Sequence, residues 1–389
     1  MVQRRKLLVG SSALFLSAIG CKSSQSGEPS GGPQAKPLGD IVVGHYAAMT
    51  GSIAHFGQDT DKAIRLAIDE VNQSGGVKGR KIKLVTLDDR GDAAEAANAV
   101  SRLIDVEKAV ALLGEVASSL SLAGGRIAQR RKIPMVSPSS TNPKVTEVGD
   151  QIFRVCFLDP FQGSVMAKFA REKLKMSKVA IIKDVRNDYS IGLADAFKKS
   201  FVSQGGSIVV EQSYSAGDSD FSAQVTAVRA AAPEAMFVPG YYAEVGAIAK
   251  TAQRLGLKIP LMGGDGWDAP DLYKIGGDAL DGSYFSNHFA PDVATPKAKK
   301  FVADFTKKYG EPPTGLGALG YDAAMVLVQA MNGAKDITSP LIRDELTKVR
   351  DFEGVTGNIT IDEGRNAKKS AVVLKISGGA AKFEAMIAP

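Results

Sequence analysis

The feature that most constrains the fold of this chain is a regular alternation of short apolar strands and amphipathic helices that begins at Asp40. Strands are predicted at 41–46, 82–87, 110–113 and 134–136, and helices are predicted between them, at 64–76, 93–106 and 119–131. Strand–helix alternation with short connections predicts a parallel sheet that is covered by helices on both faces.

The same alternation starts again after residue 178. Strands are predicted at 179–182, 207–212, 235–238 and 260–262, with helices at 191–202, 221–231 and 242–255. Two such series predict two α/β lobes of similar architecture, as the length of 389 residues allows. Because ligands bind beyond the carboxyl ends of the strands in such sheets, we expect the functional residues directly after strands.

The first residues have the composition of an export signal. Arg4-Arg5-Lys6 is a positive segment, residues 7–19 are apolar, and Ala18-Ile19-Gly20 precedes Cys21. This order is typical of a signal peptide, which we assign to residues 1–20. A cysteine at this place also resembles a bacterial lipobox, although Ala18 stands where leucine is usual, and it predicts that Cys21 is acylated. The alternative is an ordinary signal peptide that ends near a cysteine.

Residues 21–39 are predicted to form a flexible linker after the acylated cysteine. The segment is rich in serine, glycine and proline, and Leu38 is its only large apolar residue. Such a composition cannot bury enough surface to offset the entropy of ordering. We therefore expect an exported protein on the periplasmic or cell-surface side of a membrane, which it contacts only through the lipid on Cys21.

Composition argues against several other classes of protein. The net charge of +6 falls to +3 without residues 1–20, and no basic run with interleaved aromatics follows, which argues against nucleic acid as a partner. Once Cys21 is acylated, Cys156 has no partner for a disulfide or a zinc site. The three histidines lack metal-ligand spacing, and no HExxH, GxSxG or GxxxxGK[ST] motif occurs. We therefore predict neither an enzyme nor a bound metal or cofactor.

Hydroxyl-rich turns follow two strands of the first series. Residues 114–119 lead from a strand into a helix that begins near Ser118, and residues 137–143 contain Ser139, Ser140 and Thr141. Hydroxyl groups and free N–H groups at a helix N-terminus can bind a carboxylate or a phosphate. Each turn alone can also be explained as a helix cap or a loop, but together they lie at one sheet edge and favour an anion site.

In the second series, Asp265 follows a predicted strand and lies among glycines at 263–266. It can be a turn former, or a carboxylate held in a cleft for a cationic group. Tyr189 precedes a predicted helix, and Trp267 is the only tryptophan of the chain. Either ring could form an aromatic wall of a site or pack in the core.

Several stretches together resemble the leucine/isoleucine/valine-binding family of type I periplasmic binding proteins, which feed ABC importers. They include MTGSIAHFGQDTDKAIRLAIDEVNQSGGVKGRKIKLVTLDDR, LLGEVASSLS, IPMVSPSSTNP and FVPGYYAEVGAIAKTAQRLGLKIPLMGGDG. The resemblance implies two Rossmann-like lobes with parallel-rich sheets and a three-strand hinge near Asp159, His288 and Gly364. Lobe 1 would comprise 40–159 and 288–364, and lobe 2 would comprise 160–287 and 365–389.

The resemblance also implies the binding residues and the function. Family members hold an amino-acid carboxylate and ammonium with residues that match Ser118, Ser139, Thr141 and Asp265, and Ser140 lies in the same turn. Tyr189, Tyr241 and Phe56 match aromatic residues that line the pocket. The implied function is that of the extracytoplasmic solute-binding component of an ABC importer, which captures a branched-chain or related amino acid and delivers it to permease subunits. Amides, urea or aromatic acids are the alternative ligands, and a sensor subunit of a signalling system is the alternative role.

Overall fold

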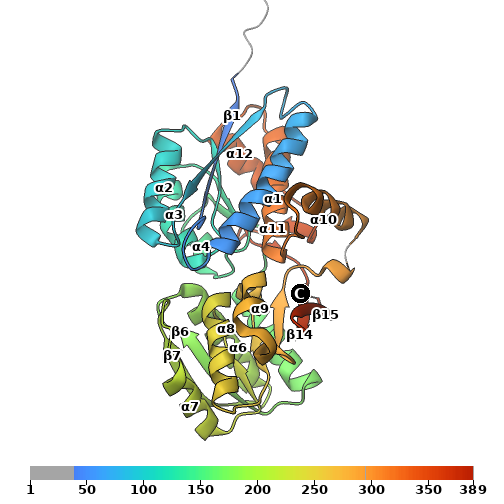
Figure 1. The fold of residues 1–389 in the computed structure, drawn as a ribbon. Coiled ribbons are helices and arrows are strands. Elements are labelled where there is room, and N and C mark those ends of the chain that lie inside the picture. The colour runs from blue at the N-terminus through green and yellow to red at the C-terminus, as the bar shows by residue number, and fades with distance from the viewer. Residues whose placement is uncertain (1–38, 294, 389) are drawn as a thin grey trace, which may run out of the picture. The chain divides into compact units, whose positions relative to one another are not determined.

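The computed structural model describes residues 39–293 and 295–388, and the helices and strands in them form two lobes (Figure 1). The expected signal peptide and acylated Cys21 lie outside the described residues, as does the expected linker apart from Gly39. Within the described ranges no helix is both long and apolar enough to cross a membrane.

Lobe 1 is built on a five-stranded parallel sheet in the order β2-β1-β3-β4-β5. Its strands are β1 (Ile41–Ala47), β2 (Ile82–Asp88), β3 (Ala111–Leu113), β4 (Met135–Ser137) and β5 (Ile152–Arg154). The strand order changes direction between β1 and β3, because β2 lies on one side of β1 whereas β3, β4 and β5 lie on the other. In sheets of this kind, such a switch point leaves a crevice at the carboxyl ends of the two strands.

Helices cover both faces of this sheet. The helices are α1 (Ala54–Gln73), α2 (Ala93–Asp105), α3 (Ser118–Arg131), α4 (Lys144–Glu147), α10 (Pro296–Tyr309), α11 (Gly315–Gly333) and α12 (Ser339–Leu346). Adjacent strand residues face opposite layers, so Leu112 packs in the cluster with residues of α2 and α3, whereas Leu113 packs with residues of α1 and α11. A small antiparallel sheet of β11 (Phe352–Gly354), β12 (Gly357–Ile361) and β13 (Ala367–Lys368) completes lobe 1.

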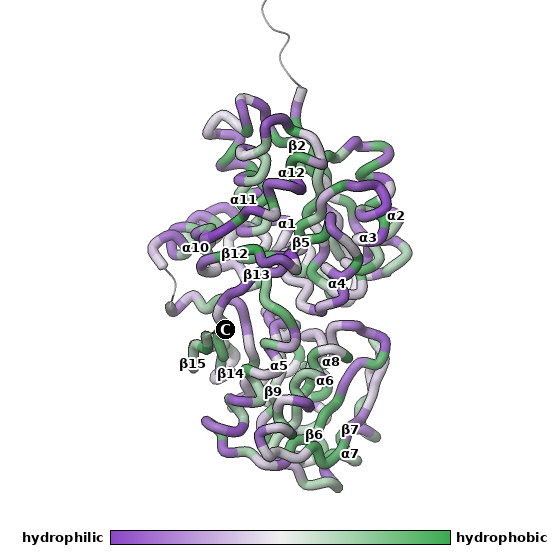
Figure 2. The backbone as a smooth tube through the Cα atoms, turned by 180° about the vertical axis from the view of Figure 1, so that it is seen from behind, coloured by the Kyte–Doolittle hydropathy of each residue, from purple (hydrophilic) through white to green (hydrophobic). Residues whose placement is uncertain are grey.

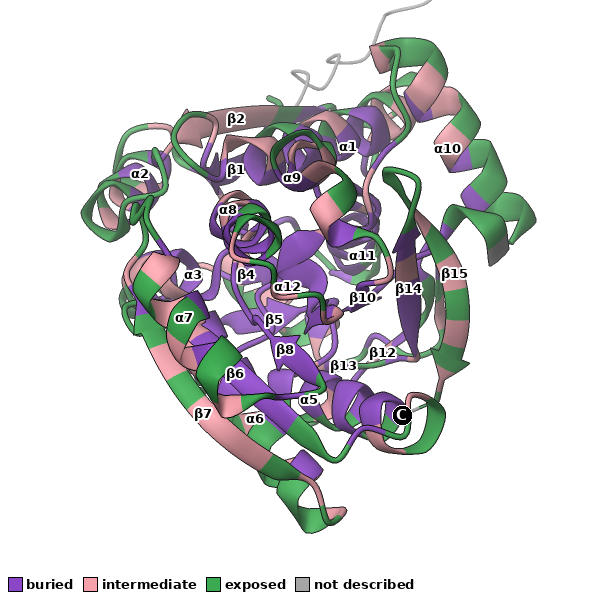
Figure 3. Ribbon diagram, turned by 60° about the horizontal axis from the view of Figure 1, so that its bottom comes forward, coloured by how far each residue is buried: buried purple, intermediate pink, exposed green. Residues whose placement is uncertain are grey.

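Lobe 2 contains a seven-stranded sheet in the order β15-β14-β10-β9-β8-β6-β7. The strands β6 (Lys178–Asp184), β7 (Ser207–Tyr214), β8 (Ala235–Phe237), β9 (Leu261–Gly263) and β10 (Tyr284–Asn287) are parallel. Two antiparallel strands, β14 (Ala371–Ser377) and β15 (Ala380–Ile387), extend one edge. The edge strand β15 alternates exposed and half-buried residues, whereas β8 is buried (Figure 3).

The helices of lobe 2 also form two layers. They are α5 (Asp159–Lys168), α6 (Asp188–Ser203), α7 (Ser222–Ala231), α8 (Tyr242–Arg254) and α9 (Pro270–Gly276). Helix α5 packs on α6, and α8 packs on α9 on the other side of the sheet. Strands such as β6 and β9 are mainly hydrophobic, whereas helix α10 of lobe 1 is mainly hydrophilic (Figure 2).

The chain passes between the lobes at residues 155–158, 288–290 and 369–370. The first two crossings lie close to Asp159 and His288. The third falls after the expected Gly364, because this glycine lies in a hairpin that returns the chain to lobe 1. Arg365 turns the hairpin with a φ of 65° and donates its N–H to Asp362 O, and β13 then pairs with β12 before the chain leaves.

Candidate ligand-binding site

Loops after strands and the first turns of helices from both lobes line a small cavity. The residues that line it are Phe56, Val116, Ser118, Ser139, Thr141 and Leu316 from lobe 1 and Tyr189, Tyr241, Asp265 and Gly266 from lobe 2. The empty space among these atoms, including the part open to solvent, is about 220 Å³. Residues of both lobes therefore lie around one small cavity.

The polar side of lobe 1 carries hydroxyl groups that lack partners. The hydroxyls of Ser139 and Thr141 are buried and bond to no other group of the described chain. Ser118 begins helix α3, and its hydroxyl accepts the N–H of Asn142 at 3.2 Å. Because unpaired buried hydroxyls are costly, the cavity is complementary to a ligand with acceptors or donors at this place.

Ser140 does not line the cavity, in contrast to the expectation from the sequence. Its hydroxyl lies 2.7 Å from the Ser121 hydroxyl and 2.9 Å from Val116 O, inside lobe 1. Ser139 and Thr141 on either side of it line the cavity, while the Ser140 hydroxyl fastens the turn to the loop after β3.

A buried arginine holds this turn from behind. The Arg154 guanidinium, at the end of β5, donates to Ser140 O and to the Thr146 hydroxyl, the latter at 3.1 Å. Burial lowers the pKa of Arg154. Nearby Cys156 is also buried, and this burial raises the pKa of its thiol to about 12. The thiol therefore has no reactive thiolate near neutral pH.

The carboxylate of Asp265 enters the cavity from lobe 2. It follows β9, and its two oxygens accept the side-chain N–H groups of Gln162 at 2.8 Å and His288 at 3.0 Å. Burial lowers the pKa of His288, against the opposing effect of Asp265. A Cβ atom on neighbouring Gly266 would lie 2.7 Å from Gly240 O, so glycine at this position permits a close approach of two loops. Close packing therefore explains the glycine at position 266, besides any turn that it forms.

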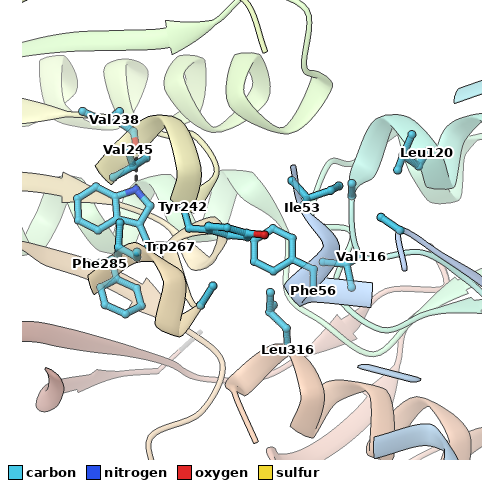
Figure 4. Packing of buried hydrophobic residues seen from close by; sticks show 14 of the residues in the cluster. Ile53, Phe56, Val116, Leu120, Val238, Tyr242, Val245, Trp267, Phe285 and Leu316 are labelled. Atoms are coloured by element: carbon cyan, nitrogen blue, oxygen red, sulfur yellow. Dashed lines mark hydrogen bonds between the residues drawn. The ribbon is translucent and has the colours of Figure 1, made fainter. Parts of the chain in front are cut away.

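Aromatic rings form the walls between the lobes. Tyr189 and Tyr241 stack with their centroids 5.4 Å apart, and the Tyr189 hydroxyl accepts the N–H of Gly266 at 3.0 Å. Phe56 of lobe 1 meets Tyr241 and Tyr242 edge-on, with centroids 5.4 and 5.0 Å apart. Figure 4 shows the Phe56 ring beside Tyr242, with Val116 and Leu316 close by.

Trp267 belongs to the core of lobe 2 and not to the cavity wall. Its ring is fully buried beside Phe285, and its indole N–H donates to Val238 O at 2.9 Å (Figure 4). The sequence analysis missed other residues of the site, namely Val116, Leu316, Gln162 and His288. Val116 adjoins a predicted turn, but Leu316, Gln162 and His288 carry no local sequence signal, since only the tertiary fold brings them to the cavity.

One further acid lies close to the cavity. Asp159, the first residue of α5, donates its N–H to Thr141 O at 3.0 Å, and both of its carboxyl oxygens are buried without a partner. Burial raises the pKa of Asp159 well above its usual range. Within residues 39–293 and 295–388, no group of three or more histidine, cysteine, aspartate or glutamate side chains is placed to hold a metal ion.

Two α/β lobes, three chain crossings and a buried cavity at the facing strand ends define a two-lobed solute-binding protein. The chain belongs to the periplasmic binding protein family, whose model matches residues 40–380. This membership confirms the predicted family resemblance and the fold class.

Individual relatives agree with the family model. The Leu/Ile/Val-binding protein homolog 3 of Brucella melitensis is 31% identical over 83% of this chain and 88% of its own length. The crystal structure of the leucine-binding protein LivK from Thermotoga maritima is 43% identical, with a TM-score of 0.86, and the match covers 90% of this chain and 99% of that one. The substrate-binding protein LivJ from Streptococcus pneumoniae, in complex with isoleucine, is 34% identical with a TM-score of 0.84, covering 90% and 99%.

Proposed function

We propose that this chain is the extracytoplasmic solute-binding component of an ABC importer and that it captures a branched-chain amino acid between its lobes. The observation that carries this proposal is the pairing of two unpartnered buried hydroxyls on lobe 1, Ser139 and Thr141, with the Asp265 carboxylate of lobe 2 in one cavity. The role is that of binding and release, without chemical conversion of the ligand.

The two ends of a zwitterion match the two polar sides of the cavity. The ligand carboxylate would be bound by Ser118, Ser139 and Thr141, near the positive N-terminal end of α3. The ligand ammonium would be bound by Asp265. Each charge that leaves water needs such replacement partners, and because these partners come from opposite lobes, the ligand stabilises the closed form.

The apolar walls favour a branched aliphatic side chain. Phe56, Val116 and Leu316 offer no hydrogen-bonding group to the cavity. In agreement, the similar structures are a leucine-binding protein and a complex with isoleucine. The carboxylate of Asp265 disfavours the alternative of an aromatic acid, since such a ligand brings a negative charge and no ammonium.

Calorimetric titration of the purified chain tests the proposal. We expect leucine, isoleucine and valine to bind at one site, and lysine and glutamate to bind at least about 100-fold more weakly, because the cavity would bury their charged side chains without partners. Acetamide, urea and benzoate form the second set of titrants. Binding of one of these without binding of any branched-chain amino acid would replace the proposed ligand class.

Export, the lipid on Cys21 and delivery to membrane permease subunits belong to the same proposal. They are supported by the charged and apolar start of the chain and by its family membership. The alternative role, as a sensor subunit of a signalling system, would use the same binding step. Uptake of labelled leucine by cells with and without the gene separates the two roles, because only an importer subunit limits uptake.

A further inference from the structure

We infer that His288 and Gln162 are positioning residues that hold the Asp265 carboxylate ready for the ammonium group of the ligand. This inference rests on the proposed function and deepens it, because it assigns the positioning of the recognising carboxylate to residues outside the cavity lining. It also places one end of this hydrogen-bond network on a segment that connects the two lobes.

The geometry around Asp265 is well defined. Gln162 Nε2 lies 2.8 Å from Oδ1, and His288 Nε2 lies 3.0 Å from Oδ2. An ionised carboxylate only accepts hydrogen bonds, so the His288 ring carries its proton on Nε2. The remaining polar atoms of the two side chains, Gln162 Oε1 and His288 Nδ1, are buried and bond to no group of the described chain. Each side chain therefore directs its hydrogen-bonding capacity to Asp265.

His288 also contacts a second segment that connects the lobes. It lies in the crossing at residues 288–290, and its ring stacks on Phe157 of the first crossing, with centroids 3.7 Å apart and planes inclined by 26°. The His288 side chain is 0% exposed and that of Asp265 is 5% exposed. The His288 ring thus links Asp265, the proposed partner of the ligand ammonium, to two of the three segments that connect the lobes. These segments must bend when the lobes open.

Two donors fix the side chain of a buried carboxylate in one orientation, so that binding costs less ordering entropy. Other titratable or charged groups act on the pair as well: Asp159, Cys156, Tyr189, Tyr241, Asp268 and Lys369. Asp159, Asp268 and Cys156 are acids or a thiol and offer the carboxylate no positive charge, and Lys369 acts on His288. A neutral N–H donor is therefore the simplest partner for the Asp265 carboxylate.

The test compares two substitutions at one position. His288→Phe keeps an aromatic ring on Phe157 but removes the donor, whereas His288→Gln keeps an N–H group that can reach Asp265. We expect His288→Phe to weaken leucine by roughly 10- to 100-fold, the effect of a lost hydrogen bond to a charged group, and His288→Gln to restore most of this loss. The control is His45→Phe, the same substitution at an equally buried histidine on β1 that contacts Leu113 O.

Binding of a second ligand separates positioning from a merely structural role. Isocaproate has the leucine skeleton without the amino group, and His288→Phe should change its binding less than about 3-fold. Equal losses for both ligands would overturn the inference.

A measurement without ligand distinguishes failure of this inference from failure of the proposed function. Imidazole-nitrogen NMR of the wild type should show His288 protonated on Nε2, with a resonance that shifts in Asp265→Asn. If the wild type binds no amino acid, the proposed function fails, and with it the ammonium as the recognised group. If it binds leucine but His288 is protonated on Nδ1, only the inference fails.

Discussion

Ser119 and Asp188 hold each other across the gap between the lobes. The Ser119 hydroxyl donates to Asp188 Oδ2 at 3.0 Å, and the backbone N–H of Asp188 donates to the same hydroxyl oxygen at 3.0 Å. Asn142 adds a bond from its side-chain N–H to Asp188 O at 2.7 Å, and Lys144 Nζ lies 3.2 Å from Asp188 Oδ1. Ser119, Asn142 and Lys144 all belong to lobe 1, so the start of α6 in lobe 2 forms a latch with the rim of the cavity.

The latch predicts an effect of Ser119→Ala on ligand release. Loss of the hydroxyl destabilises the closed form by about 0.5–1.5 kcal/mol, so leucine should dissociate roughly 2- to 12-fold faster. The association rate should stay the same, because the open form loses nothing. Stopped-flow displacement measures both rates, and Ser119→Thr, which keeps a hydroxyl, is the control. A slower association with unchanged release would show that these contacts form before the ligand is enclosed.

Asp265→Ala should abolish most of the affinity for an α-amino acid. Removal of one partner of a desolvated charge pair costs about 2–5 kcal/mol, which corresponds to roughly a 30-fold to several-thousandfold weaker binding. Ser118→Ala removes one hydroxyl bond and should cost about 1.5–3 kcal/mol. Calorimetry on both variants measures these losses. Unchanged binding by Asp265→Ala would mean that the ligand has no ammonium at this point.

Ser139→Ala and Ser140→Ala form a matched pair with opposite expected effects. The Ser139 hydroxyl has no partner, so its removal should leave the melting temperature of the unliganded protein unchanged or higher, while it weakens leucine by about 1–2 kcal/mol. The Ser140 hydroxyl bonds within lobe 1, so its removal should lower the free energy of unfolding by about 1–3 kcal/mol. Thermal melts with and without leucine measure both effects. A destabilised Ser139→Ala protein would show that its hydroxyl has an internal partner.

The buried thiol predicts a pH dependence of stability at alkaline pH. Burial raises the pKa of Cys156 from 9.0 to about 12, so the unfolded chain loses this proton first. The free energy of unfolding should therefore fall between about pH 9 and pH 12, and Cys156→Ala should remove that part of the decline. Urea unfolding of the two proteins across this range isolates the thiol from the tyrosines and lysines that titrate there too. Parallel pH profiles for the two proteins would contradict the shift.

Acylation of Cys21 stays a prediction from the sequence. The cysteine directly follows Gly20 at the end of the apolar segment, outside the described residues. Cells grown with a clickable palmitate analogue should label the wild-type protein and not Cys21→Ser. Equal labelling of the two proteins would contradict acylation of Cys21 and would leave the ordinary signal peptide as the interpretation.

Local patterns were sufficient for the elements that build the two parallel sheets. The strands predicted at 82–87 and 179–182 are observed as β2 and β6, because each is a short, mainly apolar segment between polar turns. No pattern of this kind identified β14 and β15, which were not predicted. Strand β14 pairs antiparallel with β10, which lies far away in the sequence, and β15 pairs with β14 in a hairpin, so the place of both strands in the sheet depends on the tertiary pairing of β14.

The same distinction applies to the site. Ser118, Ser139, Thr141 and Asp265 lie in segments that follow strands, and the rule that ligands bind at strand ends singled them out as candidates, which the structure places around one cavity. That rule could not separate Ser139 from Ser140, because their directions depend on how Arg154 and Ser121 fasten the turn. Nor could it find Gln162 or His288, whose contacts with Asp265 span 103 and 23 residues of sequence.

The way in which the chain threads both lobes has a consequence for the order in which the protein can fold during synthesis. The five parallel strands of lobe 2 lie within residues 178–287, so this sheet can begin to form early. Helix α1 of lobe 1, however, packs on α11, which spans residues 315–333. All the cavity-lining residues lie between Phe56 and Leu316, yet the apolar face of α1 is only partly covered, by β1 and β2, until α11 has been made. A nascent chain that already contains every one of these residues therefore still lacks most of the helix that packs on α1, and lobe 1 completes its core only when residues well beyond the site have left the ribosome.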